Sequence, residues 1–191
     1  MKTLRRFALP VFAALFFCAC AAKVSSDPSA VRTDPQTLAG IRAVLRPGDW
    51  LVSRGIHRTD DIVAGATNSA FSHAAIYDAA QDRVIEAEMQ GVHATPLPEF
   101  LAKSTRVMAL HPVWSTEYTA PLAVDRAVSA IGSGYDVTGP IGLGLPNRWY
   151  CTELLIWAYE PFRGKGGNPV PPVIEPGRML HWGRVIYDTG P

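Results

Sequence analysis

The stretch FSHAAIYDAAQDRVIEAE, residues 71–88, determines the expected fold. It contains two short runs, Ala74–Tyr77 and Arg83–Ala87, that are rich in strand-forming residues and bounded by turn residues. The five residues between them, 78–82, have the length and polarity of a hairpin connection. The stretch therefore predicts an antiparallel hairpin with a histidine at its start and two glutamates near its end.

Side chains of this hairpin alternate between the two faces of the sheet. Because alternate residues of a strand share a face, Glu86 and Glu88 project to the same side. In a register where the numbers of opposed residues have an odd sum, His73 projects to that side as well. Either carboxylate then reaches the imidazole, and the pattern by itself leaves the choice between them open.

The rest of the chain supplies further elements on both sides of the hairpin. Asp34 and Pro35 are typical of a helix start, and Thr59 is expected to cap a second helix. The expected helices lie at 36–45, 59–68, 98–103, 117–131 and 152–160, and the expected strands at 50–54, 74–77, 83–87, 91–95, 105–111 and 184–187. Pro121 indicates that the fourth helix begins there or is kinked. Residues 140–146, rich in Gly and Pro, are expected to be irregular. The mixed order of helices and strands predicts an α+β fold with an antiparallel sheet.

Composition and motifs exclude several classes of function. A formal net charge of +1 offers no basic surface, so nucleic acid is not an expected partner. The chain has no glycine-rich phosphate loop, no HExxH and no paired CxxC, so neither a nucleotide site nor a zinc site is expected. We therefore expect no cofactor and no metal.

The N-terminal residues have the pattern of an export signal. Lys2, Arg5 and Arg6 precede the apolar segment 7–17, which is too short to span a bilayer. We expect residues 1–19 to be a signal peptide, 20–33 to be a polar tether and 34–191 to form one domain.

Cys20 follows the small residue Ala19, which resembles the bacterial lipobox in which such a cysteine is lipidated. Ordinary cleavage after Ala19 or Ala22 is the alternative. The resemblance, with Ala21 after the cysteine, implies an exported outer-membrane lipoprotein facing the periplasm, with an outer-membrane lipid as its anchoring partner.

Cys151 is the other cysteine of the expected mature chain. A lipidated Cys20 cannot pair with it, so Cys151 is a lone thiol that is either buried and inert or kept for its reactivity. It stands at the start of the helix expected at 152–160, where free amides and the helix dipole favour a thiolate. The same amides are able to stabilise an oxyanion.

A base for this thiol must come from elsewhere in the chain. The chain has five histidines, at positions 57, 73, 93, 111 and 181. His73 is favoured because it begins a strand of apolar residues and therefore lies at the edge of a buried sheet. We interpret His57, His93, His111 and His181 as surface or structural residues, and Trp149 and Trp157 as core or cleft-wall aromatics.

Several motifs together resemble a known family. They are Arg46-Pro47-Gly48-Asp49, Ser72-His73-Ala74-Ala75-Ile76-Tyr77, Val84-Ile85-Glu86-Ala87, Gly134-Tyr135-Asp136 and Tyr150-Cys151-Thr152-Glu153-Leu154. This set resembles the YiiX/YaeF/YebB-like permuted papain-like amidases of the NlpC-type cysteine hydrolase superfamily, which are akin to lecithin-retinol acyltransferase-like proteins. In this family the catalytic residues follow the order histidine, polar residue, cysteine. The resemblance extends from Arg46 to about Tyr159.

The resemblance implies a permuted papain-like (NlpC-type) fold, with an antiparallel sheet or half-barrel packed against helices. It implies that Cys151 is the nucleophile, His73 its base and Glu86 the residue that orients the imidazole. The residues expected to line the substrate site are Ser72, Tyr135, Asp136 and Tyr150, although a structural role is also open for Tyr135 and Asp136. The glycine-rich segment 139–144 and the proline-rich loop after Phe162 depart from the family pattern.

The implied function is a cysteine-dependent hydrolase of the amidase or peptidase type at the bacterial cell envelope. Its substrate would be an envelope peptide, amide or lipid. Two alternatives stay open: an acyltransferase of the same fold that uses a lipid or an amine as acceptor, and an envelope-binding lipoprotein whose catalytic set is vestigial. The sequence leaves the oligomeric state open.

Overall fold

The computed structural model describes residues 34–164 and 169–190. The predicted signal peptide, the lipidation site Cys20 and the tether at 20–33 lie outside the described residues. Within the described part of the chain, none of the helices combines the length and the apolar character needed to cross a bilayer.

A six-stranded antiparallel sheet forms the centre of the molecule, with the strand order β4-β3-β2-β1-β5-β8. Its strands are β1 (Trp50–Gly55), β2 (His73–Asp78), β3 (Arg83–Glu88), β4 (Gly91–Pro96), β5 (Ser104–Pro112) and β8 (Gly183–Asp188). Every neighbouring pair in this sheet is antiparallel. The expected α+β class with an antiparallel sheet is confirmed.

The hairpin of β2 and β3 has the register that places the histidine beside the glutamates. Ala75 pairs with Glu86 and Ile76 with Ile85, so the numbers of opposed residues have an odd sum. Since paired residues project to the same side of a sheet, His73 shares a face with Glu86. The turn between the two strands includes Asp82 in the left-handed conformation, with φ of 47°.

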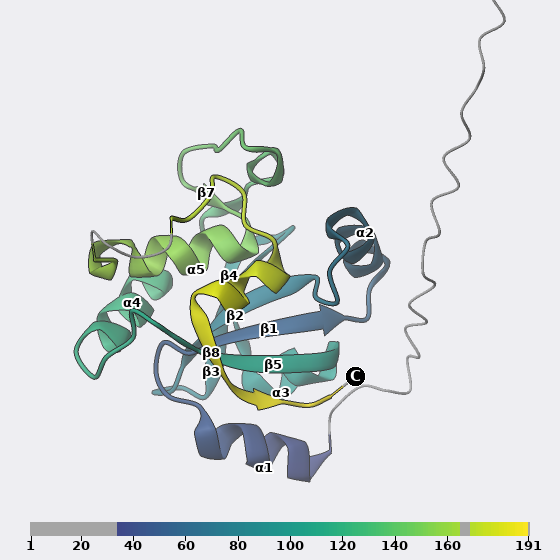
Figure 1. The fold of residues 1–191 in the computed structure, drawn as a ribbon, viewed down its shortest axis with the longest axis vertical. Coiled ribbons are helices and arrows are strands. Elements are labelled where there is room, and N and C mark those ends of the chain that lie inside the picture. The colour runs from purple at the N-terminus through teal and green to yellow at the C-terminus, as the bar shows by residue number, and fades with distance from the viewer. Residues whose placement is uncertain (1–33, 165–168, 191) are drawn as a thin grey trace, which may run out of the picture.

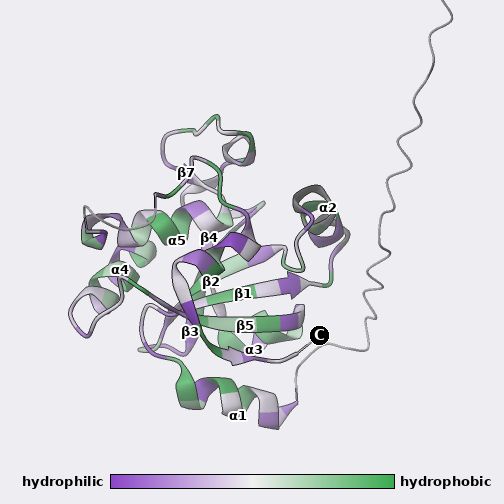
Figure 2. Cartoon of the chain, in the orientation of Figure 1, coloured by the Kyte–Doolittle hydropathy of each residue, from purple (hydrophilic) through white to green (hydrophobic). Residues whose placement is uncertain are grey.

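Helices cover both faces of the sheet (Figure 1). On one face, α1 (Pro35–Val44) and α3 (Leu97–Ala102) pack Ile41, Leu97 and Phe100 against strand residues such as Leu51 and Val84. On the other face lie α4 (Thr119–Ser129), α5 (Cys151–Tyr159) and the 3₁₀ helix η4 (Pro176–His181). Figure 2 shows β1 and β5 as hydrophobic through the middle of the sheet, as expected for strands covered on both sides.

The helix starts differ in how well the sequence predicted them. Asp34 caps α1 as expected, because its Oδ1 accepts a hydrogen bond from the Thr37 N–H at 2.8 Å. The second helix is present as α2 (Arg58–Thr67), but its predicted cap was wrong: the N-cap is His57 rather than Thr59. Asp60 then stands at the third helical position, where its carboxylate accepts from the His57 N–H at 3.0 Å.

Several small features were not expected. A two-stranded parallel sheet joins β6 (Gly134–Tyr135) to β7 (Arg148–Trp149), and 3₁₀ turns occur at η2 (Gly139–Ile141) and η3 (Glu160–Phe162). Elements this short carry no periodic pattern for a sequence to show. α4 begins at Thr119, which places Pro121 in the first helical turn where it breaks no hydrogen bond.

Candidate active site

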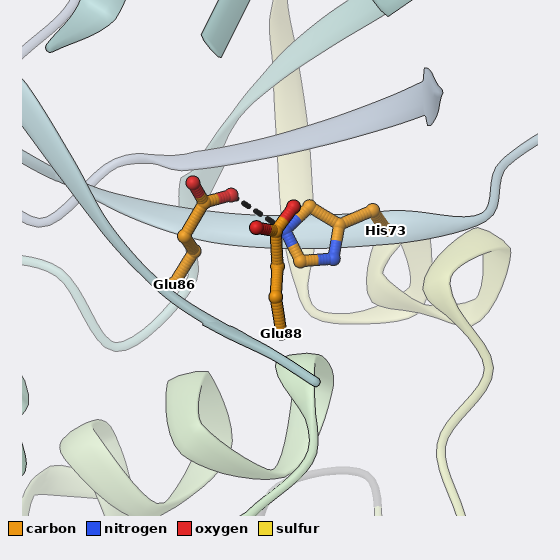
Figure 3. Close-up of side chains that lie close together, drawn as sticks. All are labelled: His73, Glu86 and Glu88. Carbon is orange, nitrogen blue, oxygen red and sulfur yellow. Dashed lines mark hydrogen bonds and ion pairs between the residues drawn. The ribbon is translucent and has the colours of Figure 1, made fainter. Parts of the chain in front are cut away.

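His73 and Glu86 form a hydrogen-bonded pair at the end of the central hairpin (Figure 3). The His73 Nε2 lies 2.7 Å from the Glu86 Oε2. The Glu86 side chain is fully buried, and the ring of Phe100 lies beside the imidazole with 6.2 Å between ring centroids. The choice that the sequence left open is thus made in the structure, because the carboxylate bonded to the imidazole is Glu86 and not Glu88.

The second oxygen of Glu86 has partners of its own. Thr95 donates its hydroxyl to Glu86 Oε1 at 2.5 Å, and the Lys103 ammonium donates to the same atom at 3.0 Å. Lys103 also donates to Glu88 Oε1 at 3.2 Å. His93, which is paired with Glu86 across β3 and β4, places its Nε2 3.5 Å from Glu88 Oε2.

These contacts keep the carboxylates ionised. Burial raises the pKa of Glu86, but hydrogen bonds from His73 and His93 and the charges of His73 and Lys103 outweigh burial and hold that pKa well below its usual range. The hydrogen bond from His93 is the main cause that lowers the pKa of Glu88 to about 2. The same bonds, to Glu86 and Glu88, raise the pKa of His93 to about 10. Glu86, Glu88 and His93 are therefore all charged at neutral pH.

Cys151 is the first residue of α5 and is a free, largely buried thiol. It shares a cavity with His73. Burial of the imidazole lowers the pKa of His73, but hydrogen bonds to Cys151 and to Glu86 raise it more, so that the His73 pKa lies well above its ordinary value. The imidazole is therefore hydrogen-bonded to the carboxylate and lines the same cavity as the thiol.

The cavity over these residues has a volume of about 530 Å³, within the usual range for small-molecule sites. The end of β1, helix α2 and the turn between β3 and β4 form its walls. Ile62 of α2 and Met89 of that turn line it, and both are about 70% exposed. Apolar side chains thus stand at the cavity's solvent-exposed rim.

Two of the four residues predicted to line the substrate site do line this cavity: Tyr135 and Ser72. Burial, with the nearby charge of Cys151, raises the pKa of the Tyr135 phenol, which is therefore neutral. The Ser72 hydroxyl already has partners, since it donates to Asp60 Oδ1 at 2.7 Å and accepts from the Gly55 N–H at 3.0 Å. Its role is to join α2 to the end of β1.

The other two predictions, Asp136 and Tyr150, do not line the cavity. Asp136 is buried and its carboxylate accepts from the N–H groups of Thr138, Gly139 and Leu145, so it closes the loop before β7. The Tyr150 hydroxyl accepts from the Ile174 N–H at 3.2 Å. Tyr150 lines a separate hollow of about 270 Å³ beside α5. Asp136 directly follows Tyr135, and Tyr150 directly precedes Cys151. The hydrogen bonds of Asp136 and Tyr150 nevertheless hold their side chains away from the cavity.

Sequence reasoning missed the partners of Glu86. Lys103 and Thr95 were not singled out, and His93 was interpreted as a surface or structural residue. The pairing of Glu86 with His93 and of Val84 with Thr95 across β3 and β4 brings both side chains to one face. A known register between β3 and β4 would have identified His93 and Thr95 as neighbours of Glu86. The sequence carries no signal that Lys103, at the end of α3, contacts Glu86.

The remaining aromatic and histidine residues divide between the cavity and the framework. His57 lines the cavity, which the sequence did not indicate. His111 places its Nδ1 2.7 Å from the buried Asp49, a structural pair at the other end of the strands. Trp149 and Trp157 stack on each other with 4.5 Å between ring centroids and line the second hollow.

Comparisons with known proteins identify a family and a similar fold. The sequence model of the family described as "permuted papain-like amidase enzyme, YaeF/YiiX, C92 family" matches residues 45–165, which is more than half of the chain. A crystal structure of the metalloprotein YiiX from Escherichia coli O157:H7 is similar to the fold, with a TM-score of 0.52 and 20% sequence identity. The similarity covers 61% of this chain and 65% of that one, just under two thirds of its length. None of the curated proteins compared with the chain matches it.

Proposed function

Because the chain belongs to the permuted papain-like amidase family YaeF/YiiX, C92, we propose that it is a cysteine-dependent hydrolase of amide or ester bonds. Cys151 is the nucleophile, His73 the base and Glu86 the residue that orients the imidazole. One observation carries this proposal: the His73 Nε2 is hydrogen-bonded to the buried Glu86, and the His73 ring lines the same cavity as the Cys151 thiol.

The geometry assigns the two ring nitrogens of His73 to different tasks. Glu86 engages Nε2, so Nδ1 is the nitrogen that accepts the thiol proton. The thiolate attacks the carbonyl carbon and forms a C–S bond, while the carbonyl oxygen becomes an oxyanion near the first amides of α5. His73 then protonates the leaving amine or alcohol as its bond to carbon breaks. Water cleaves the thioester, releases the acid and restores the thiol.

The cavity favours a substrate with an apolar group near the scissile bond. Ile62 and Met89 stand exposed at the rim, and Phe100 lies deeper beside His73. Apolar contact with such side chains contributes roughly 25 cal/mol per Å² of buried surface. We therefore expect uncharged acyl groups to be cleaved faster than anionic ones, because Glu88 also lines the cavity.

The proposal is tested by labelling and by turnover of a chromogenic ester. In the wild-type protein Cys151 should form an iodoacetamide adduct at pH 6 at least about tenfold faster than a free thiol such as N-acetylcysteine, and the protein should hydrolyse p-nitrophenyl butyrate. Cys151→Ala should fold, lose the fast adduct and lose turnover, while His73→Ala should lose the fast labelling. Equal labelling of the Cys151→Ala variant would contradict the proposal.

The same assay separates the alternative functions. Added hydroxylamine or a primary amine that diverts the acyl group to an amide, at the expense of free acid, would indicate an acyltransferase. Wild-type protein that is never acylated by any ester, and whose Cys151 reacts like an ordinary thiol, would indicate a vestigial site in a binding protein. Hydrolysis with release of the free acid is the outcome that we expect.

A divalent metal does not suit the group formed by His73, Glu86 and Glu88, although donor atoms of the three lie within 4.8 Å of one another. The two oxygens of Glu86 are already held by His73, Thr95 and Lys103. Moreover, the Lys103 ammonium occupies the position between the two carboxylates that a cation would take. The charges there are compensated by protein groups.

We also propose that the protein acts at the cell envelope. The support is the sequence of residues 1–20, with a positive start, an apolar segment and Cys20 after a small residue. Metabolic labelling with an alkyne fatty acid should mark the wild-type chain in the outer-membrane fraction. Cys20→Ser should remove the label, and retention of the label in this variant would contradict the lipidation site.

A further inference from the structure

Lys103 stands at the end of α3 and faces both carboxylates. Its backbone N–H donates to Glu99 O at 3.2 Å in the last turn of the helix, and β5 begins at the next residue. From there its ammonium lies 3.0 Å from Glu86 Oε1 and 3.2 Å from Glu88 Oε1. One positive charge therefore bridges a fully buried carboxylate and a partly exposed one.

Two carboxylates that contact the same ammonium group need a counter-charge to stay ionised. Burial and mutual repulsion both favour protonation of a carboxyl group. A protonated Glu86 would lose its ion pair with the His73 imidazolium. His93 also helps, but its Nε2 lies 3.4 Å from Glu86 and 3.5 Å from Glu88, farther than the Lys103 ammonium from either. Lys103 is therefore the closest counter-charge that is not itself part of the proton transfer.

The charged and titratable groups around the cavity come from all the elements that surround it. They are His73 of β2, Glu86 and Glu88 of β3, His93 of β4, Lys103 after α3, Tyr135 of β6, Cys151 of α5, and His57 and Asp60 at the start of α2. Next to this cavity the carboxylates of Glu86 and Glu88 face the cations of His73, His93 and Lys103, and His73 shares the cavity with Cys151. Removal of the Lys103 charge takes away a cation that lies 3.0 Å from Glu86 Oε1 and 3.2 Å from Glu88 Oε1.

We infer that Lys103 is a positioning residue for the thiol–imidazole pair: it holds Glu86 ionised through Oε1, so that Oε2 keeps the His73 ring directed at Cys151. This inference rests on the proposed function, because it concerns how the same site is kept in its reactive form. Thr95 has a supporting part, since its hydroxyl fixes the same oxygen of Glu86. Lys103 acts through Glu86 and not through the substrate.

The test measures the rate of iodoacetamide labelling of Cys151 in the full chain between pH 5 and pH 9. Lys103→Gln keeps a hydrogen-bonding side chain but removes the charge, and should slow labelling at pH 6 by about three- to tenfold while leaving the rate at pH 9 within about twofold. Lys103→Arg keeps the charge and should stay within about twofold of wild type. The matched control is Arg83→Gln, which removes another cation bonded to a carboxylate, Asp78, on the same hairpin but outside the cavity lining.

A Lys103→Gln profile that superimposes on the wild-type profile would overturn the inference. So would a higher KM for p-nitrophenyl butyrate at unchanged kcat, because that pattern places Lys103 on the substrate. If Lys103→Gln does not fold, Glu88→Gln provides the second test. The Glu88→Gln variant leaves Glu86 as the carboxylate that pairs with Lys103 and should raise the labelling rate of Cys151 at pH 6. A slower rate would overturn the inference.

Failure of the inference is distinguishable from failure of the proposed function. Wild-type Cys151 that reacts at pH 6 no faster than N-acetylcysteine would contradict the proposed function, whatever the variants do. Fast wild-type labelling that depends on His73 but not on the charge of Lys103 would contradict only the role of Lys103.

Discussion

Glu86 shows how one side chain acquires a role through its contacts. Glu88 projects from the same face of β3, yet its oxygens are bonded to Lys103 and Gln90. Only Glu86 presents an oxygen to the His73 Nε2. The difference between two chemically identical groups is therefore one of burial and partners, since Glu86 is fully buried and Glu88 is 27% exposed.

Glu86→Gln should show what the charge of this carboxylate contributes. The amide still accepts a hydrogen bond from the ring, but the negative charge that raises the His73 pKa is lost, so this pKa should fall. We expect ester turnover at neutral pH to fall by at least about tenfold. NMR titration of the His73 ring and steady-state kinetics measure the two effects. Glu88→Gln is the control, and a larger loss of turnover in that variant would mean that the orienting residue has been assigned wrongly.

Among the elements, the loop between β6 and β7 depends on one buried carboxylate. Asp136 accepts hydrogen bonds from Thr138, Gly139 and Leu145 and so closes a loop that leads from Tyr135, in the cavity wall, back toward Cys151. Ile141 and Leu143 on this loop are exposed, so packing contributes little to its shape. The hydrogen bonds of Asp136, together with those within the loop itself, therefore hold its conformation.

Asp136→Ala should loosen this loop and leave the central sheet intact. We expect amide hydrogen exchange across residues 137–147 to accelerate about tenfold or more, because several N–H groups lose their acceptor. Exchange in β1, β2 and β5 should be unchanged. Asp125→Ala, at an exposed position of α4, serves as the control. Unaltered exchange in the loop of the Asp136→Ala variant would show that other contacts hold it.

Over the whole molecule, the ion pairs at the cavity join parts of the chain that are distant in sequence. They connect β3, β4 and the end of α3 at one edge of the sheet. Their contribution to stability decreases at both low and high pH. Glu88, whose pKa is lowered to about 2, contributes stability that is lost as the pH falls from about 4.5 toward 2. His93, whose pKa is raised to about 10, contributes stability that is complete below about 6.5 and is lost as the pH rises toward 10.

His93→Gln should therefore be destabilising near pH 6 and nearly neutral at pH 10. We expect the difference in free energy of unfolding between wild type and variant to shrink by about 1 kcal/mol or more over this range. Urea denaturation at pH 6, 8 and 10 measures it. His181→Gln, an exposed histidine of η4, is the control. A difference that stays constant with pH would show that the His93 charge does not stabilise the fold.

The hairpin and its chemistry were predictable from sequence because the relevant information is local. Apolar runs and turn residues indicated the two strands, and the alternation of side chains placed Glu86 and Glu88 on one face. His73 joins that face only in the register that the structure shows. The capped start of α1 was predictable for the same reason. The N-cap of α2 was not, because Thr59 and His57 compete for that position and the partners of Asp60 decide between them.

The sequence by itself determined the class of fold and the two strands of the central hairpin, since each depends on neighbours within a few residues, and it indicated Cys151 and His73 as the candidate thiol and imidazole. Only the tertiary structure decided that Glu86 and not Glu88 is hydrogen-bonded to His73, and that Lys103 and Thr95 donate to Glu86. It also decided that Asp136 accepts hydrogen bonds from the loop before β7. The physical reason is that these contacts join strands and helix ends far apart in the chain. Their partners are selected by packing and by competition among charges, which no local pattern of residues encodes.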